Sequence, residues 1–195
     1  MLNKYDPTKY IEIITPEFLQ LDRLLKGFNI FNATDMRRRE IKHTKFLAHL
    51  LDPHESHGLG IRFLENFIIN LNNQNIKKID FLSLDLMNAV VSSEEKLEKN
   101  AIDLLIRIPS STESLRPILI AIEVKVDSIE SELQLEKYRK YIEEIYPEFD
   151  RQYYFLTANG DDPKDDNWMG ITVGGVISPT IENLIKCYTD TISSY

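Results

Sequence analysis

Three ionisable residues near the ends of two apolar stretches have the types and spacing needed for phosphate chemistry. Glu123 and Lys125 lie near the end of the run 118–126, and Asp103 lies near the start of the run 101–108. Side chains alternate between the two faces of a strand, so Glu123 and Lys125 share one face. Antiparallel pairing of the two runs would bring all three residues to one corner of a sheet.

Two interpretations of this corner are open. Charged groups buried in a sheet cost several kcal/mol unless they pair or hold an ion. Glu123 and Lys125 could therefore form an ion pair that braces the strand end. Alternatively, Asp103, Glu123 and the carbonyl of Val124 supply oxygen ligands of the kind that Mg²⁺ prefers. A divalent ion lowers the pKa of a bound water and neutralises phosphate charge, which suits phosphodiester hydrolysis.

The elements that must position these residues follow from periodicity and turn residues. Apolar runs predict strands at about residues 89–96, 101–108, 118–126, 153–157 and 168–176, the first two forming a hairpin. An amphipathic helix is predicted over about residues 130–146 and ends at Pro147. Its predicted stripe, at spacings of four, three and four, consists of Gln134, Tyr138, Tyr141 and Ile145.

The first third of the chain is predicted to be helical. Capping and apolar spacing predict helices that begin at about residues 15, 36 and 63 and end at about residues 27, 51 and 71. Glycines and a proline make 52–60 a loop, and a last short helix is predicted over 181–188. Glu40, on the second helix, is expected to face partly toward the core. Just before it, Arg37, Arg38 and Arg39 form a basic cluster that is either a solvated helix face or a phosphate-binding surface.

These residues resemble the PD-(D/E)xK nuclease superfamily: Asp103, then Glu123-Val124-Lys125 at the end of an apolar strand, then Gln134 and Tyr138 on the next helix. Upstream, residues 43–53, with their Leu-Leu-Asp-Pro ending, and the turn His57-Gly58-Leu59-Gly60 resemble the N-terminal signature of one prokaryotic branch of that superfamily. Ile102 stands where the motif has a proline, which leaves the carboxylate of Asp103 in place.

The resemblance implies roles for individual residues. Asp103 and Glu123 would be metal ligands, and Glu40 would join them from its helix. Lys125 would position or activate water, and Gln134 would orient the lysine or the substrate. The implied metal is Mg²⁺, for which Mn²⁺ can substitute. We assign substrate contacts to Tyr138 and to Arg37, Arg38 and Arg39, although a core position for the tyrosine is an open alternative.

Two other groups of residues compete with this assignment. Asp52, His54 and His57 could form a transition-metal cluster, or His57 could hydrogen-bond the backbone of a turn. Among Glu94, Glu95 and Glu98, one could approach the metal site, and the alternative is a position on the surface.

Composition limits the class of protein. With 195 residues, 43% of them hydrophobic, we expect one domain over 1–195, with a helical part at 1–75 and a sheet core at 85–195. No run of 18 apolar residues occurs, so no membrane partner is expected. The single cysteine, Cys187, is expected to be buried and fits a reducing, cytoplasmic location.

The sequence therefore predicts an α/β protein with a restriction-endonuclease-like central mixed β-sheet of four or five strands flanked by helices. The expected function is Mg²⁺-dependent cleavage of phosphodiester bonds, in DNA rather than RNA. The net charge of −8 is unusual for a nucleic-acid partner, and the acidic excess lies in the second half of the chain. A catalytically inactive interaction module that binds a protein partner through this acidic half is the alternative, and a homodimer is also left open.

Overall fold

A computed structural model describes residues 40–74, 78–96, 101–125 and 133–193, with side chains from residue 41 to residue 189. The helix predicted at 15–27, the arginine cluster at 37–39, Glu98 and the turn of the predicted hairpin lie outside the described residues. The expectation of one domain over 1–195 therefore stays a prediction.

A five-stranded mixed sheet forms the centre of the described part, in the spatial order β1-β2-β3-β4-β5. The first three strands are antiparallel, and β4 and β5 run parallel to β3. Strand β3 is central, and every residue in it except Lys125 is buried. The strands are β1 (Val90–Lys96), β2 (Ala101–Ile108), β3 (Ile118–Lys125), β4 (Asp150–Thr157) and β5 (Met169–Thr172).

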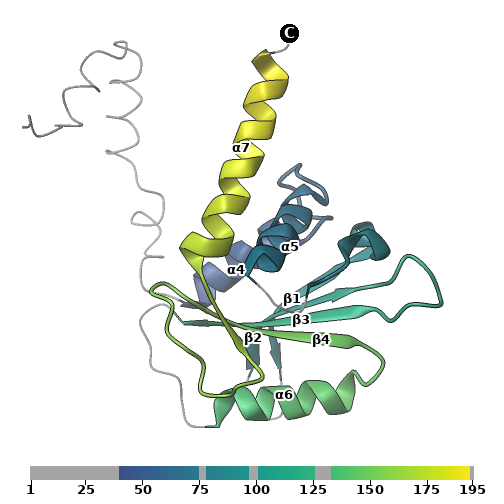
Figure 1. Cartoon of the computed structure of the whole chain (residues 1–195), viewed down its shortest axis with the longest axis vertical. Helices are drawn as coiled ribbons and strands as arrows, with labels where there is room; N and C mark the ends of the chain where they lie inside the picture. The colour runs from purple at the N-terminus through teal and green to yellow at the C-terminus, as the bar shows by residue number, and fades with distance from the viewer. Residues whose placement is uncertain (1–39, 75–77, 97–100, 126–132, 194–195) are drawn as a thin grey trace, which may run out of the picture. The chain divides into compact units, whose positions relative to one another are not determined.

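Helices cover both faces of the sheet, as Figure 1 shows. On one face lie α4 (Glu40–Leu51), α5 (Arg62–Gln74) and α7 (Ser178–Ser193), and on the other lies α6 (Gln134–Ile145). Short helical turns η1 (Phe81–Ser83), η2 (Leu86–Asn88) and η3 (Val173–Ile177) connect these elements. The predicted α/β class, with a mixed sheet flanked by helices, is confirmed.

Each face of the sheet has its own apolar core. Alternate residues of β2 and β3, such as Ile106 and Ile120, pack with Phe63 and Phe67 of α5. The opposite residues, such as Leu119 and Ala121, pack against α6. Because side chains alternate along a strand, the α6 side is also the side to which Glu123 belongs. The candidate site therefore lies on the face of the sheet that, among the described helices, only α6 covers.

Three predictions about the C-terminal half are wrong in detail. The strand predicted over 168–176 ends at Thr172, whose hydroxyl accepts a hydrogen bond from the Gly175 amide at 2.9 Å and begins the turn η3. The last helix is longer than 181–188, because Ser178 and Pro179 already form its first turn. Cys187 is exposed, not buried.

The buried stripe of α6 also differs from the predicted one. It consists of Leu135, Tyr138 and Ile142, whereas Ile145 is 48% exposed. The predicted stripe was therefore right at Tyr138 and wrong at its C-terminal end. The shift matters for the site, because it leaves Gln134 beside the core, at the start of the helix, and able to reach the sheet edge.

A buried polar contact joins α5 to α7 and gives a test of the fold. Thr180 is fully buried, donates to the carbonyl of Val176 at 2.7 Å and accepts from Nδ2 of Asn70 at 3.1 Å. Thr180→Val keeps the shape but leaves polar groups unsatisfied, so we expect a loss of about 1–2 kcal/mol in the free energy of unfolding. Urea denaturation measures this loss. Thr189→Val is the matched control, because exposed Thr189 makes the same local bond to a carbonyl, that of Ile185; equal losses in both variants would contradict the expectation.

Candidate active site

The ends of β2 and β3 bring Asp103 and Glu123 together. The antiparallel pairing of these strands ends with Leu104 opposite Ile122. These two residues are the sequence neighbours of Asp103 and Glu123. Beyond that pair, Oδ2 of Asp103 accepts a hydrogen bond from the amide of Val124 at 2.8 Å. The Asp103 side chain thus takes the place of a backbone acceptor at the strand end, and its carboxylate is fixed next to that of Glu123.

The two oxygens of Glu123 have different surroundings. Oε1 accepts hydrogen bonds from Nζ of Lys125 and from Nε2 of Gln134, both at 2.8 Å. Oε2 is buried and has no hydrogen-bond partner among the described residues. The whole residue is only 1% exposed. A buried carboxylate oxygen without a donor is costly, so this atom marks a position where a ligand would be stabilised.

Electrostatics lead to the same position. Burial raises the pKa of Glu123 to about 7, the neighbouring Asp103 carboxylate raises it as well, and Lys125 only partly offsets these effects. Two carboxylates this close repel each other, so near neutral pH the pair takes up a proton unless a cation is bound. The site therefore favours a positive charge beyond that of Lys125.

Helix α6 supports the site from the other side. Gln134, its first residue, donates to Glu123 and also to the hydroxyl of Tyr138 at 2.8 Å. That hydroxyl in turn donates to the carbonyl of Ala101 at 2.9 Å. Tyr138 is 2% exposed, so its position fits a support for Gln134 better than the predicted substrate contact. Burial raises the pKa of the Tyr138 hydroxyl, and so does the charge of Glu123, which keeps the phenol protonated.

A divalent metal fits the residues present. The unsatisfied Oε2 of Glu123, the adjacent Asp103 and their mutual repulsion are the features that a cation relieves, and carboxylate oxygens are suitable ligands. The described residues supply two carboxylates here. They do not include a group of three or more His, Cys, Asp or Glu side chains placed to hold a metal. The side chain of Glu40, the predicted third acid, is not described, so its role stays a prediction.

The strand β1 passes the site in a strained conformation. Glu94 lies between two registered pairs, Ser93 with Leu104 and Glu95 with Ile102, which places it opposite Asp103. Its φ of 54° falls in the left-handed region, which is unusual for a residue other than glycine. Its carboxylate pairs with Lys45 of α4 at 3.8 Å. This strain beside the site was not visible in the sequence.

The histidine loop forms a turn rather than a metal cluster. Nδ1 of His57 accepts from the amide of Leu59, and Nε2 donates to the carbonyl of Asp52, both at 2.9 Å. Because both ring nitrogens are used by the backbone, neither offers a free lone pair to a metal. The structural alternative for this loop is confirmed.

Comparison with models of known protein families identifies the class of this protein. A family model described as the PD-(D/E)XK nuclease superfamily matches residues 28–188, which is most of the chain and includes every element of the site. The protein belongs to the PD-(D/E)XK nuclease superfamily. Its mixed sheet with helices on both faces is consistent with the restriction-endonuclease-like fold expected for that class. Searches of curated proteins and of solved structures gave no significant match. None of the described helices is long and apolar enough to cross a membrane.

Proposed function

We propose that this protein is a metal-dependent nuclease that hydrolyses phosphodiester bonds, with DNA as the substrate. The observation that carries the proposal is the buried Oε2 of Glu123, which has no hydrogen-bond partner among the described residues and lies beside a second carboxylate. Membership in the nuclease superfamily supports a nucleic-acid substrate. The preference for DNA over RNA is part of the proposal.

In this proposal each side chain at the sheet edge has a separate role in catalysis. Asp103 and Glu123 hold Mg²⁺, or Mn²⁺ in its place, and Glu40 contributes from α4. The ion, when bound, supplies Lewis-acid stabilisation of phosphate charge and a lowered pKa for water. Lys125, two residues along the same face from Glu123, stabilises the charge that develops on the phosphate. Gln134 holds Oε1 of Glu123 and so orients the carboxylate toward the ion.

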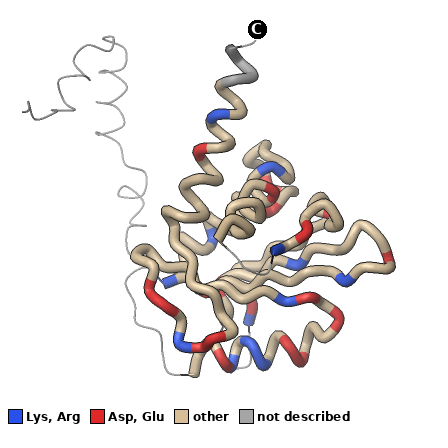
Figure 2. The backbone as a smooth tube through the Cα atoms, in the orientation of Figure 1, with Lys and Arg blue, Asp and Glu red and all other residues tan. Residues whose placement is uncertain are grey.

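Substrate contacts are proposed for residues outside the described part. Arg37, Arg38 and Arg39 precede the first turn of α4, and each can neutralise a backbone phosphate. Such contacts compensate for the acidic excess in the second half of the chain. Figure 2 shows acidic residues concentrated in the loop between β4 and β5, whereas acidic and basic residues are interspersed along α6. Replacing all three arginines with glutamine would then weaken DNA binding and flatten its salt dependence.

A cleavage assay tests the proposal directly. Purified protein is incubated with single- and double-stranded DNA and RNA, with Mg²⁺, with Mn²⁺ or with chelator, and the Lys125→Ala protein is run in parallel. We expect metal-dependent cutting of DNA by the wild type, no cutting with chelator and none by Lys125→Ala. Cutting that survives both the chelator and the Lys125→Ala change would contradict the proposal.

The alternative is an inactive nuclease-fold module that binds a protein partner or a second copy of itself. The acidic excess of residues 127–166, with 12 acidic and 5 basic side chains, favours it, since such a charge suits a basic protein better than DNA. Metal titration separates the two functions. Saturable Mn²⁺ binding that is lost in Asp103→Ala favours the nuclease, and the absence of any binding favours the interaction module.

A further inference from the structure

The first turn of α6 carries Gln134, and its N-cap residue supplies no side-chain cap within the described part of the chain. Leu133, at the N-cap position, has a φ of 62° and makes no side-chain hydrogen bond to the helix. A left-handed conformation costs roughly 1–2 kcal/mol for a residue with a Cβ. The Leu133 side chain is also 57% exposed, so it does not anchor the turn by packing. Among the described residues, contacts from elsewhere in the protein therefore contribute to the position of this turn.

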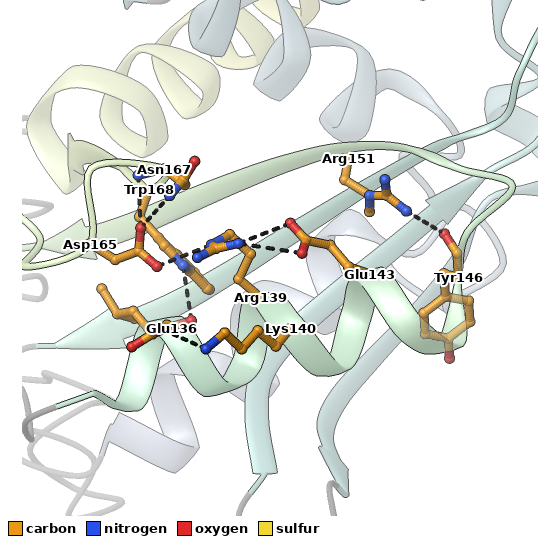
Figure 3. A network of polar contacts seen from close by, with 10 residues as sticks. Glu136, Arg139, Lys140, Glu143, Tyr146, Arg151, Asp165, Asn167 and Trp168 are labelled. Atoms are coloured by element: carbon orange, nitrogen blue, oxygen red, sulfur yellow. Dashed lines mark hydrogen bonds and ion pairs between the residues drawn. The ribbon is translucent and has the colours of Figure 1, made fainter.

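The loop between β4 and β5 supplies two such contacts, as Figure 3 shows. The indole Nε1 of Trp168 donates to the carbonyl of Leu135 at 3.2 Å. Nε of Arg139 donates to Oδ2 of Asp165 at 3.1 Å. The side chains of this ion pair are only 19% and 11% exposed, so water screens the attraction less than at an open surface. Both contacts fall on the first two turns of the helix.

The loop is itself well ordered by hydrogen bonds. Oδ1 of Asp165 accepts from the amide and from the side chain of Asn167, at 2.9 and 2.7 Å. The amide of Trp168 donates to the carbonyl of Asp165 at 2.9 Å, and its ring packs on Tyr153 with centroids 5.4 Å apart. The carboxylate of Asp165 thus holds the loop together through Oδ1 and binds Arg139 of α6 through Oδ2.

The other end of the loop begins beside the active-site lysine. Thr157, the last residue of β4, is registered with Lys125 of β3. Its buried hydroxyl accepts from the amides of Gly160 and Asp161 at 2.8 and 3.0 Å. The loop therefore leaves the sheet next to Lys125 and returns to the helix that carries Gln134, so it links the two sides of the site.

We propose that Asp165 is a positioning residue for the active site: through Arg139, together with Trp168, it holds the first turn of α6 where Gln134 can donate to Glu123. This inference rests on the proposed nuclease function for its catalytic consequence. Its structural part, the dependence of the Gln134 contact on Asp165, does not need activity.

Glu143 provides a matched control on the same arginine. Nη1 of Arg139 contacts both carboxylate oxygens of Glu143, at 3.2 and 3.3 Å. Glu143 lies on α6 itself, one turn further along, so this pair cannot hold the helix against the loop. Its side chain is also 40% exposed. Glu143→Gln removes the negative charge that pairs with Arg139 but leaves the contact between Arg139 and Asp165. This variant should leave the Gln134 hydrogen bond and the activity unchanged.

The direct test follows the side-chain amide of Gln134 by ¹H–¹⁵N NMR. Its pair of signals is assigned as the pair that disappears in Gln134→Ala. In Asp165→Ala we expect these signals to move toward the values of solvated glutamine and to exchange faster with water, and in Glu143→Gln to stay in place. Trp168→Phe keeps an aromatic ring but removes the indole donor to Leu135, and it should change the signals in the same direction. Unchanged Gln134 signals in both Asp165→Ala and Trp168→Phe would overturn the proposal.

Kinetics test the catalytic consequence. We expect Asp165→Ala to lower kcat by about tenfold to a hundredfold, because a small displacement of a positioned group is costly. If Asp165 acts through Gln134, the double variant Asp165→Ala/Gln134→Ala is no slower than Gln134→Ala alone. Additive losses would overturn the proposal. A wild-type protein that cleaves nothing would instead contradict the proposed function, and the Gln134 signals would still decide the structural part.

Discussion

Replacing Asp103 with asparagine is expected to lower the rate of DNA cleavage by at least about a thousandfold while the domain stays folded. The amide oxygen of asparagine can still accept the hydrogen bond that Val124 donates to Asp103. The negative charge that would hold the metal is lost. The measurement is the initial rate on a labelled duplex at saturating Mg²⁺, with thermal unfolding to check the fold.

A second variant, at Lys125, separates metal binding from stabilisation of the charge that develops on the phosphate. The side chain of Lys125 is only 14% exposed. Lys125→Met keeps its aliphatic part but removes the positive charge. Cleavage should be lost as severely as in Asp103→Asn, whereas Mn²⁺ binding measured by calorimetry should be retained. Lys140→Ala, which removes an exposed lysine paired with Glu136 on the same helix, serves as the charge control and should cleave normally. Full activity in Asp103→Asn would contradict the assignment of the active site.

Much of this site was predictable because it is built from local patterns. The alternation of side chains placed Glu123 and Lys125 on one face of β3. The expected antiparallel pairing of the runs 101–108 and 118–126 placed Asp103 at the adjacent strand end. The resemblance to the superfamily added Gln134. The contacts of Asp165, Arg139 and Trp168 were not predictable, because they join segments about 30 residues apart and depend on how the loop packs on α6.

The errors in the fold have the same origin. Periodicity found every strand, but it could not show that the Thr172 hydroxyl would end β5 by accepting from Gly175. The strain at Glu94 and Leu133 was likewise invisible, since neither residue type favours a left-handed backbone and tertiary contacts impose it. Burial of Cys187 was expected from its residue type, whereas its position on an exposed part of α7 is decided by packing.

The raised pKa of Glu123 predicts how metal-free stability depends on pH. The ordinary pKa of this carboxyl is 4.5, and in the folded protein burial raises it to about 7. The folded state thus binds the proton more tightly than the unfolded state. Its stabilising contribution is complete below about pH 4.5 and is lost as the pH rises through 7. Relative to a side chain that does not titrate, the wild type should lose about 3 kcal/mol of unfolding free energy over that interval.

Glu123→Gln is the comparison that isolates this effect, because glutamine keeps the shape and stays neutral. Denaturation in chelator between pH 4.5 and 8 should show the stability difference, wild type minus variant, falling steadily as the pH rises. Titratable groups that do not interact with this side chain contribute equally to both proteins and cancel in that difference. Mg²⁺ added at pH 8 should then stabilise the wild type and not the variant, because a ligand that binds the folded state selectively shifts the equilibrium toward it. A difference that stays flat with pH would mean that Glu123 is ionised throughout. In that event Lys125 and Gln134 alone would compensate its charge, and the argument for a cation at Oε2 would lose its electrostatic support.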